Sequence, residues 1–435
     1  MLVEAWVTRA ARRWPERVAV ETVERSISYR ELERLATAGA RELAVAPGSR
    51  VAIALAPGLD SVLALHACLR AGAVAVPLDL RDPLDAQRSP ASDAIIDRPL
   101  SCSGAPPAEN ARHELDATAL VVRTSGTSGE PKEVPLTYGN FLWSAIGSAV
   151  ALGLDPRERW LCTLPLVHVG GLSIVLRSAI YGTTAVVHER FEVHAALEAL
   201  MEREITLVSV VATTLGRLLD GGVARPPALR CALAGGGPVP AGLLARARAA
   251  GVVVSQTYGL TEACSQVATQ APGDTAVAAG PPLFCTRIAL APDGEILVGG
   301  PTLSPAVAGG TLATGDLGDL GADGSLQVIG RKSDTIISGG ENIAPSQVEA
   351  VLEEHPAVLE AAVFAVADAH WGEAVHALVV ARQAVSAAEL REHCGRRLAP
   401  FKVPKSIAFT DALPRTASGK LQRSRLAIDL GRTKS

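Results

Sequence analysis

The sequence contains no run of about 18 apolar residues, the length that a membrane-spanning helix needs. It also has no prominent basic run, since 41 Lys and Arg residues stand against 45 Asp and Glu residues for a net charge of −4. This balance argues against nucleic acid as a partner. The first residues include an acid and no long apolar core, so they are not typical of a signal peptide. We therefore expect no membrane span and no nucleic-acid partner.

No Cys-x-x-Cys pair occurs among the seven cysteines, which are scattered and odd in number. This pattern argues against a zinc site and is typical of reduced thiols. We therefore expect a cytoplasmic protein. The sequence says nothing about oligomeric state, and a homo-oligomer stays open.

The 435 residues are 48% hydrophobic and 20% charged, which is typical of a globular protein with about two or three domains. Strands alternate with helices up to residue 260. A strand over Val51–Leu55, a helix over Asp60–Ala71 and a strand over Val74–Pro77 form a βαβ unit, which predicts a parallel sheet. The following stretch from Arg81 to His113 is rich in Pro, Ser and Asp and is predicted to be a loop.

Beyond residue 260 the pattern changes. Asp293-Gly294 and Asp323-Gly324 predict turns in a small β-rich lobe, and the tail predicts a compact α+β unit. The expected fold class is α/β, with a large N-terminal domain of parallel or mixed sheets and flanking helices, this lobe, and a small α+β C-terminal domain.

One glycine- and hydroxyl-rich stretch, Thr124–Lys132, follows the apolar strand Ala119–Val122. Glycines let the backbone present its N–H groups to a ligand, and a nest of such groups binds anions. Lys132 adds a positive charge, so the stretch suits a polyphosphate. It is not a Walker A loop, because Gly126 and Gly129 are three residues apart and Glu133 follows the lysine. An ordinary loop after a strand is the alternative interpretation.

Four further stretches lie at strand ends or turns. Taken alone, each is better explained as a plain turn, a surface ion pair or a flexible surface segment. They are Gln256–Glu262 (QTYGLTE), Thr314–Asp316 (TGD), Gly330–Asn342 (GRKSDTIISGGEN) and Pro414–Lys420 (PRTASGK).

Together, in this order and spacing, these stretches resemble the adenylate-forming superfamily of acyl-CoA synthetases, peptide-synthetase adenylation domains and luciferases. The resemblance extends from about Ser28 to Leu426. It implies a two-step reaction in which a carboxylate attacks the α-phosphate of ATP and a thiol, normally that of coenzyme A, then attacks the acyl-adenylate. The chain departs from the superfamily at Glu133, where glycine is usual, and in the shortness of residues 81–118.

The resemblance also implies site residues. Glu262 would carry Mg²⁺, which prefers carboxylate and phosphate oxygens. Thr261 would bind the α-phosphate, and Lys420 would stabilise charge that develops between the carboxylate and that phosphate. The implied ATP-binding residues are Thr124, Ser125, Gly126, Thr127, Ser128, Gly129, Lys132, Gly235, Gly236, Gly237, Gln256, Thr257, Tyr258, Gly259, Thr261, Asp316, Arg331 and Lys420.

In the superfamily the C-terminal domain is mobile. The resemblance therefore predicts a nucleotide- and acyl-binding domain over residues 1–331 and a mobile domain over residues 332–435 that carries Lys420. Ser333 matches the hinge position, where aspartate or lysine is common, and a loop hinge absorbs large backbone rotations. Gly339 and Gly340 would line the coenzyme A tunnel.

The stretch Pro165–Ser173 and its neighbours resemble the o-succinylbenzoate–CoA ligases of menaquinone biosynthesis, a family within the superfamily. His168 matches the gate residue of the acyl pocket, with a packed histidine as the alternative. The second carboxylate of that acid would need buried donors. The candidates are Arg177, Thr213, Ser265 and Gln266.

Three other functions stay open on the sequence. The chain could be another aryl- or acyl-CoA ligase, a stand-alone adenylation enzyme that loads a carrier protein, or a nucleotide-binding sensor without turnover. Retention of Glu262, Asp316, Arg331 and Lys420 argues against the sensor. The implied small molecules are ATP, Mg²⁺, coenzyme A and a carboxylic acid.

Overall fold

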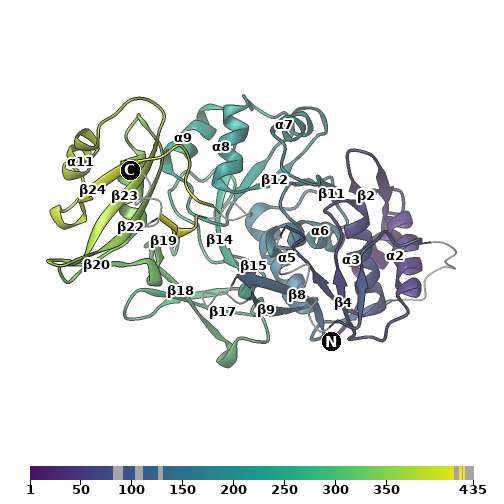
Figure 1. The fold of residues 1–435 in the computed structure, drawn as a ribbon. Helices are drawn as coiled ribbons and strands as arrows, with labels where there is room; N and C mark the ends of the chain where they lie inside the picture. The colour runs from purple at the N-terminus through teal and green to yellow at the C-terminus, as the bar shows by residue number, and fades with distance from the viewer. Residues whose placement is uncertain (82–91, 103–110, 126–130, 416–420, 424, 427–435) are drawn as a thin grey trace. The chain divides into compact units, whose positions relative to one another are not determined.

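The computed structural model describes residues 1–81, 92–102, 111–125, 131–415, 421–423 and 425–426 (Figure 1). Two compact units divide the chain. Unit 1 holds residues 1–236, 247–288 and 298–312, and unit 2 holds residues 237–246, 289–297 and 313–435. Each is described by itself below, and the predicted boundary between residues 331 and 332 stays a prediction.

Unit 1 contains two large sheets. The first runs in the order β6-β4-β5-β8-β9 and is parallel except for its edge strand β9. The second runs in the order β15-β14-β13-β12-β10-β11-β2-β3, parallel from β14 to β2 and antiparallel at both edges. The strands of the first sheet are β4 (Arg50–Ile53), β5 (Val74–Pro77), β6 (Ala94–Ile96), β8 (Thr118–Ser125) and β9 (Pro131–Thr137). Those of the second are β2 (Val18–Glu21), β3 (Ser26–Ser28), β10 (Arg159–Cys162), β11 (Thr184–Val187), β12 (Leu207–Val210), β13 (Cys231–Ala234), β14 (Val254–Leu260) and β15 (Ser265–Thr269).

Helices connect these strands, and five of them, between residues 6 and 181, share one apolar core with strands of both sheets. Ser28 caps the second helix by accepting a hydrogen bond from the Glu31 N–H at 3.2 Å, as a serine N-cap does. Trp160, Phe141 and Leu172 are among the fully buried side chains of this core. The helices are α1 (Trp6–Arg13), α2 (Tyr29–Leu43), α3 (Leu59–Ala71), α5 (Tyr138–Leu152), α6 (Val169–Tyr181), α7 (Val193–Glu202) and α8 (Ala212–Asp220). The helix α9 (Ala241–Ala249), between β13 and β14 in sequence, belongs largely to unit 2. A separate two-stranded sheet pairs β1 (Leu2–Glu4) with β7 (Arg112–Glu114).

Unit 2 is built on two smaller sheets. One runs in the order β16-β17-β18-β19, and the Asp-Gly pairs lie between β16 and β17 and between β18 and β19, as predicted. The other runs β21-β20-β23-β22, with β24 parallel to β23. The strands are β16 (Arg287–Leu290), β17 (Glu295–Gly299), β18 (Thr311–Leu320), β19 (Leu326–Arg331), β20 (Ile336–Ser338), β21 (Glu341–Ile343), β22 (Val358–Asp368), β23 (Gly372–Ala381) and β24 (Ser406–Phe409), and the helices are α10 (Pro345–Glu353) and α11 (Ala387–Gly395).

The α/β class with mixed sheets and a β-rich part is confirmed, but the loop predicted from Arg81 to His113 is wrong in part. Ala94–Ile96 forms β6 beside β4, and β7 begins at Arg112. Both strands are three residues long, so their apolar signal is weak among the surrounding Pro, Ser and Asp residues.

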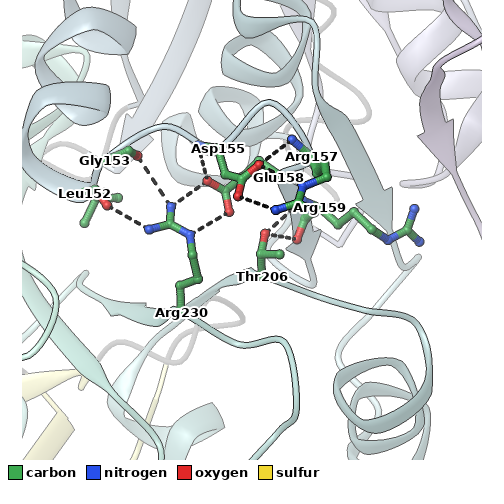
Figure 2. Close-up of polar contacts among 8 residues, drawn as sticks. All are labelled: Leu152, Gly153, Asp155, Arg157, Glu158, Arg159, Thr206 and Arg230. Carbon is green, nitrogen blue, oxygen red and sulfur yellow. Dashed lines mark hydrogen bonds and ion pairs between the residues drawn. The ribbon is translucent and has the colours of Figure 1, made fainter.

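An ion pair between a buried glutamate and a half-buried arginine holds three elements of unit 1 together (Figure 2). Glu158 is 2% exposed and contacts Arg230 at 2.6 Å. Arg230 also donates to the Leu152 carbonyl at 3.2 Å, and Glu158 directly precedes β10 as Arg230 precedes β13. Because both charges are satisfied, the pair fixes the end of α5 against the starts of two parallel strands.

Two further expectations concern the lack of a membrane-spanning helix and the presence of reduced cysteines. None of the helices in the described parts of the chain combines the length and apolar character needed to cross a bilayer. The seven cysteines, all among the described residues, are free, and six of them are buried.

Candidate functional site

The two described ends of the predicted phosphate-binding stretch lie on the paired antiparallel strands β8 and β9. Thr124 of β8 lies opposite Lys132 of β9, and the Thr124 hydroxyl donates to the Lys132 carbonyl at 3.4 Å. Gly126, Thr127, Ser128 and Gly129 lie outside the described residues. The strand pairing thus fixes both ends of the stretch and leaves the Lys132 side chain 62% exposed.

Lys132 meets the predicted metal ligand. Its Nζ lies 3.9 Å from Oε1 of Glu262, although the two residues are 130 positions apart in sequence. Glu262 sits in a single helical turn, Thr261–Ala263, directly after β14. The backbone carbonyl of Glu262 accepts from the Ser304 N–H at 2.8 Å, which fixes the turn from the other side. A cation and a carboxylate therefore meet at adjoining strand ends, as a site for metal-bound phosphate requires.

The turn after Glu262 is conformationally restricted. Cys264 and Ser265 have φ values of 53° and 90°, which side-chain-bearing residues seldom adopt. A Cβ at Gly259 would lie 1.8 Å from the Ser265 carbonyl oxygen, so only glycine fits there. The tight return places Ser265 beside the end of β14, close along the backbone to Glu262.

The glycine turn after β13 lies beside β14. A Cβ at Gly235 would be 2.8 Å from Cγ2 of Thr257, and Gly236 has a φ of 77°. A side chain at Gly237 would meet open space. The absence of side chains leaves bare backbone next to Thr257, and Tyr258, which follows it and is also an implied ATP-binding residue, is half-buried. Gly235 and the end of β14 therefore adjoin in unit 1.

The side chains of Gln256 and Thr257 form hydrogen bonds with backbone carbonyls of the protein. The Gln256 amide donates to the carbonyls of Ala276 and Ala278 at 3.3 and 3.1 Å. The Thr257 hydroxyl donates to the Ala268 carbonyl at 2.9 Å. Because these hydrogen bonds occupy both side chains, the side chains stabilise the end of β14. A contact of Gln256 or Thr257 with ATP would therefore involve their backbone groups.

The predicted acyl residues differ in their surroundings. His168 precedes α6, and its Nε2 is buried with no hydrogen-bond partner among the described residues. Burial lowers the pKa of His168, and the Arg81 guanidinium lowers it further. Thr213 lies half-buried in the first turn of α8. Gln266 is 2% exposed and donates to the Thr269 hydroxyl at 2.9 Å, while its carbonyl oxygen has no described partner.

Arg177 is the unusual member of this group. It lies on α6, is 3% exposed, and donates from Nη2 to the Ser144 hydroxyl at 2.9 Å. That hydroxyl donates in turn to the Cys264 carbonyl at 2.7 Å, in the turn after Glu262. Among the described residues no Asp or Glu pairs with Arg177, and burial lowers its pKa. A buried guanidinium without a counter-charge is costly, so this position suits an anionic ligand.

In unit 2, Asp316 and Arg331 face each other across β18 and β19. Arg331 Nε lies 2.8 Å from Asp316 Oδ1, and Asp316 is 8% exposed. Gly315 has a φ of 72° and donates its N–H to Glu295 at 2.8 Å. The TGD stretch and Arg331 therefore lie side by side in unit 2.

Gly339 and Gly340 form a two-residue hairpin turn between β20 and β21, with φ values of 61° and 85°. A Cβ at Gly339 would lie 2.9 Å from the ring of Trp371, and Nζ of Lys405 lies 4.7 Å from that ring's centroid. Sequence reasoning missed Trp371 and Lys405, because only the fold brings them beside the glycine turn. Ser333 is exposed, and Lys420 lies outside the described residues.

No group of three or more His, Cys, Asp or Glu side chains gathers in the described ranges. A hard cation beside Glu262 would therefore need oxygens from a ligand such as a polyphosphate. This requirement fits a magnesium ion that arrives with ATP.

Comparison with known proteins gives a family for this geometry. The model of the AMP-binding enzyme family matches residues 7–97 and 81–307, and the model of the AMP-binding enzyme C-terminal domain matches residues 347–420. The 2-succinylbenzoate–CoA ligase of Bacillus subtilis (strain 168) is 38% identical over 470 residues, which cover 97% of this chain and 97% of that protein.

Solved structures of an o-succinylbenzoate CoA synthetase also match this chain. The o-succinylbenzoate CoA synthetase of Bacillus subtilis in complex with its acyl-adenylate intermediate has a TM-score of 0.87 at 37% identity, covering 98% of each chain. The same enzyme in complex with ATP and magnesium ion has a TM-score of 0.88 at 37% identity, covering 98% of this chain and 100% of that one.

Proposed function

We propose that this chain, which belongs to the AMP-binding enzyme family, is an ATP-dependent ligase that joins 2-succinylbenzoate to coenzyme A. The acid's carboxylate oxygen forms a bond to the α-phosphorus of ATP, and pyrophosphate leaves. The thiol of coenzyme A then forms a bond to the acyl carbon, its proton is lost, and AMP leaves. The reaction would serve menaquinone biosynthesis in the cytoplasm, a location that the free cysteines support.

The contact between Lys132 and Glu262 is the main observation that supports the adenylation step. Lys132, at the start of β9, would hold the β- and γ-phosphates, while Glu262, 3.9 Å away, would hold the magnesium ion that accompanies them. Bound there, the metal would neutralise charge on the leaving pyrophosphate. Thr261, next to Glu262 in the same turn, would donate its hydroxyl to the α-phosphate. Lys420 would stabilise the charge that develops as the carboxylate attacks.

The nucleoside would be held by backbone and by one carboxylate. Gly235 and Gly236 leave a flat surface on which adenine can lie, with Tyr258 as the stacking residue. Asp316, fixed by Arg331 at 2.8 Å, would accept from the ribose hydroxyls. Because Arg331 donates to Asp316, it keeps that carboxylate ionised and oriented as an acceptor.

The buried Arg177 supports an acid with two carboxylates. One carboxylate is activated at the phosphate, and the second would supply the negative charge that Arg177 lacks among the described residues. A hydrogen bond to a charged group contributes about 1.5–3 kcal/mol, or roughly ten- to a hundredfold in specificity. Ser265, Gln266 and Thr213 are further donors, and His168 would gate the pocket. A mono-acid would leave the guanidinium unpaired.

For the thiol step, the Gly339-Gly340 turn offers a bare path for a pantetheine arm. Trp371 lies against this turn, and Lys405 lies over the Trp371 ring. An aromatic surface with a cation beside it suits the nucleotide end of coenzyme A. Ser333 would serve as the hinge between the two steps.

Pyrophosphate release by the purified protein tests this proposal. With ATP, Mg²⁺ and 2-succinylbenzoate, pyrophosphate should appear before coenzyme A is added, and thioester only afterwards. A thioester with the pantetheine arm of a carrier protein instead would identify a stand-alone adenylation enzyme. Pyrophosphate with other acids only would identify another acyl-CoA ligase, and none with any acid would identify a nucleotide-binding sensor.

A further inference from the structure

A buried serine, Ser304, joins the turn of Glu262 to β9, the strand that carries Lys132. The Ser304 N–H donates to the Glu262 carbonyl at 2.8 Å, and the Ser304 hydroxyl donates to the Pro135 carbonyl of β9 at 2.7 Å. That hydroxyl also accepts from the Ala306 N–H at 3.2 Å, so its orientation is fixed from both sides. One residue therefore bonds the strand of the phosphate-binding cation to the turn of the metal-binding carboxylate.

Asn140 holds the segment that carries Ser304. Its side-chain amide donates to the carbonyls of Pro301 and Leu303 at 2.8 and 2.9 Å. Its amide oxygen accepts from the Thr137 N–H at 2.9 Å, at the point where β9 passes directly into α5. Asn140 is buried, and both sides of its amide are bonded. The segment of residues 301–304 is therefore attached to one continuous piece of chain, β9 and α5.

The other end of the same turn is attached to α5 by Ser144. This serine is buried in the middle of the helix and donates to the Cys264 carbonyl at 2.7 Å. The turn is therefore held at Glu262 and again at Cys264. Lys132 and Glu262 lie on the two parts of the chain that these bonds join, and 3.9 Å separates Nζ from Oε1. The bonds of Ser304 and Ser144 fix this separation through the backbone.

We propose that Ser304 is a positioning residue that fixes Glu262 relative to Lys132. The inference rests on the roles that the proposed function gives to these two residues. β9 is the edge strand of its sheet, so the bond from Ser304 ties its outer side to the turn. A magnesium ion shared by a carboxylate and phosphate oxygens binds best when the carboxylate is already placed. Without the Ser304 hydroxyl, the strand and the turn move independently, and the metal has to order them.

Ser304→Ala tests this positioning through calorimetric titration with ATP, in the presence and absence of Mg²⁺. The gain in ATP affinity that Mg²⁺ confers should fall about two- to tenfold, as expected for one lost neutral hydrogen bond. The affinity for ATP without Mg²⁺ should change little. The magnesium concentration for half-maximal pyrophosphate release should rise by a similar factor, whereas the KM for 2-succinylbenzoate at saturating Mg²⁺ should stay at the wild-type value. A general loss of stability would not produce this split.

Thr302→Val is the matched control, because Thr302 lies in the same segment, is fully buried, and has a hydroxyl without a hydrogen-bond partner among the described residues. It should leave the gain from Mg²⁺ unchanged. In a protein that already carries Lys132→Ala, Ser304→Ala should reduce the gain by a smaller factor. The two substitutions act on one contact, so their effects should not multiply.

Three results would overturn the inference: an unchanged gain in Ser304→Ala, an equal loss in Thr302→Val, or an undiminished effect of Ser304→Ala beside Lys132→Ala. If Ser304→Ala does not fold, Ser304→Cys decides by the same criteria, because cysteine keeps the size and only a weak donor. Failure of the proposed function shows on the wild-type protein alone, which would then release no pyrophosphate with 2-succinylbenzoate.

Discussion

Glu262 is the residue on which the phosphate side of the site depends. Glu262→Gln keeps the side-chain shape but removes the charge beside Lys132, and so removes the carboxylate that Mg²⁺ prefers. The magnesium concentration needed for half-maximal pyrophosphate release should rise, and the rate at saturating magnesium should fall about 10²-fold. A magnesium titration of the variant checks this, and a curve identical to that of the wild type would assign the metal to another ligand.

Arg177 should determine which acid is used. Arg177→Met removes a cation that is 3% exposed while keeping most of its length. The KM for 2-succinylbenzoate should rise roughly ten- to a hundredfold, as expected for one lost charged hydrogen bond, while the KM for 4-phenyl-4-oxobutyrate should change little. An equal rise for both acids would mean that Arg177 acts on the turn through Ser144 and Cys264 instead of on the ring carboxylate.

Some of these residue contacts follow from sequence and others do not. The residue types at Lys132 and Glu262 indicate phosphate and metal, and the fold brings them to 3.9 Å. The burial of Arg177 has no local signal, because an arginine on a helix is usually exposed and its partner Ser144 comes from another helix. The position of Trp371 beside Gly339 likewise depends on the pairing of β20 with β23.

At the scale of elements, the ion pair Glu158–Arg230 should matter for stability. Glu158→Gln leaves Arg230 without a counter-charge where three elements meet. The free energy of unfolding should fall by about 2–3 kcal/mol, less than the roughly 3–5 kcal/mol of a fully buried pair because Arg230 is 32% exposed.

Arg157→Ala is the matched control for this variant, because the Arg157 side chain is 89% exposed in the same loop. It should change the free energy of unfolding by less than about 0.5 kcal/mol. Urea unfolding of both variants measures the difference. An equal fall in the free energy of unfolding in both variants would show that the Glu158–Arg230 pair stabilises the fold no more than an exposed arginine does.

Elements with a regular pattern could be predicted, and the exceptions have physical reasons. The βαβ pattern from Val51 to Pro77 gives the correct elements. The strand β9 is hard to predict from sequence because it contains Pro131 and Pro135, and proline usually argues against a strand. It lies at the edge of its sheet, where proline is tolerated. β14 continues through Gly259 because a bulge there accommodates the returning chain.

For the whole molecule, stability should depend on pH through two buried histidines. Burial lowers the pKa of His66 to about 4, and burial together with the neighbouring charges of His66 and Arg70 lowers the pKa of His113 to about 3. Below the unfolded pKa of about 6.5, the unfolded chain binds protons that the folded chain does not. Stability is therefore complete above pH 6.5 and falls as the pH drops towards 4.

The slope should approach about 1.4 kcal/mol per pH unit for each histidine. Urea unfolding at several values between pH 7 and pH 5 checks this in the wild type and in His66→Leu. In His66→Leu, the slope of the unfolding free energy against pH should be smaller by up to about 1.4 kcal/mol per pH unit, the contribution of one histidine. Identical slopes in both proteins would mean that His66 is not neutral in the folded state.

The claim that the chain ligates an aromatic dicarboxylate is tested most directly by competition. Equal concentrations of 2-succinylbenzoate and 4-phenyl-4-oxobutyrate are given to the purified protein with ATP, Mg²⁺ and coenzyme A, and the two thioesters are quantified by mass spectrometry. Because Arg177 has no Asp or Glu partner among the described residues, we expect at least a roughly tenfold excess of the 2-succinylbenzoyl thioester. Equal amounts of the two products, or an excess of the mono-acid product, would contradict the account.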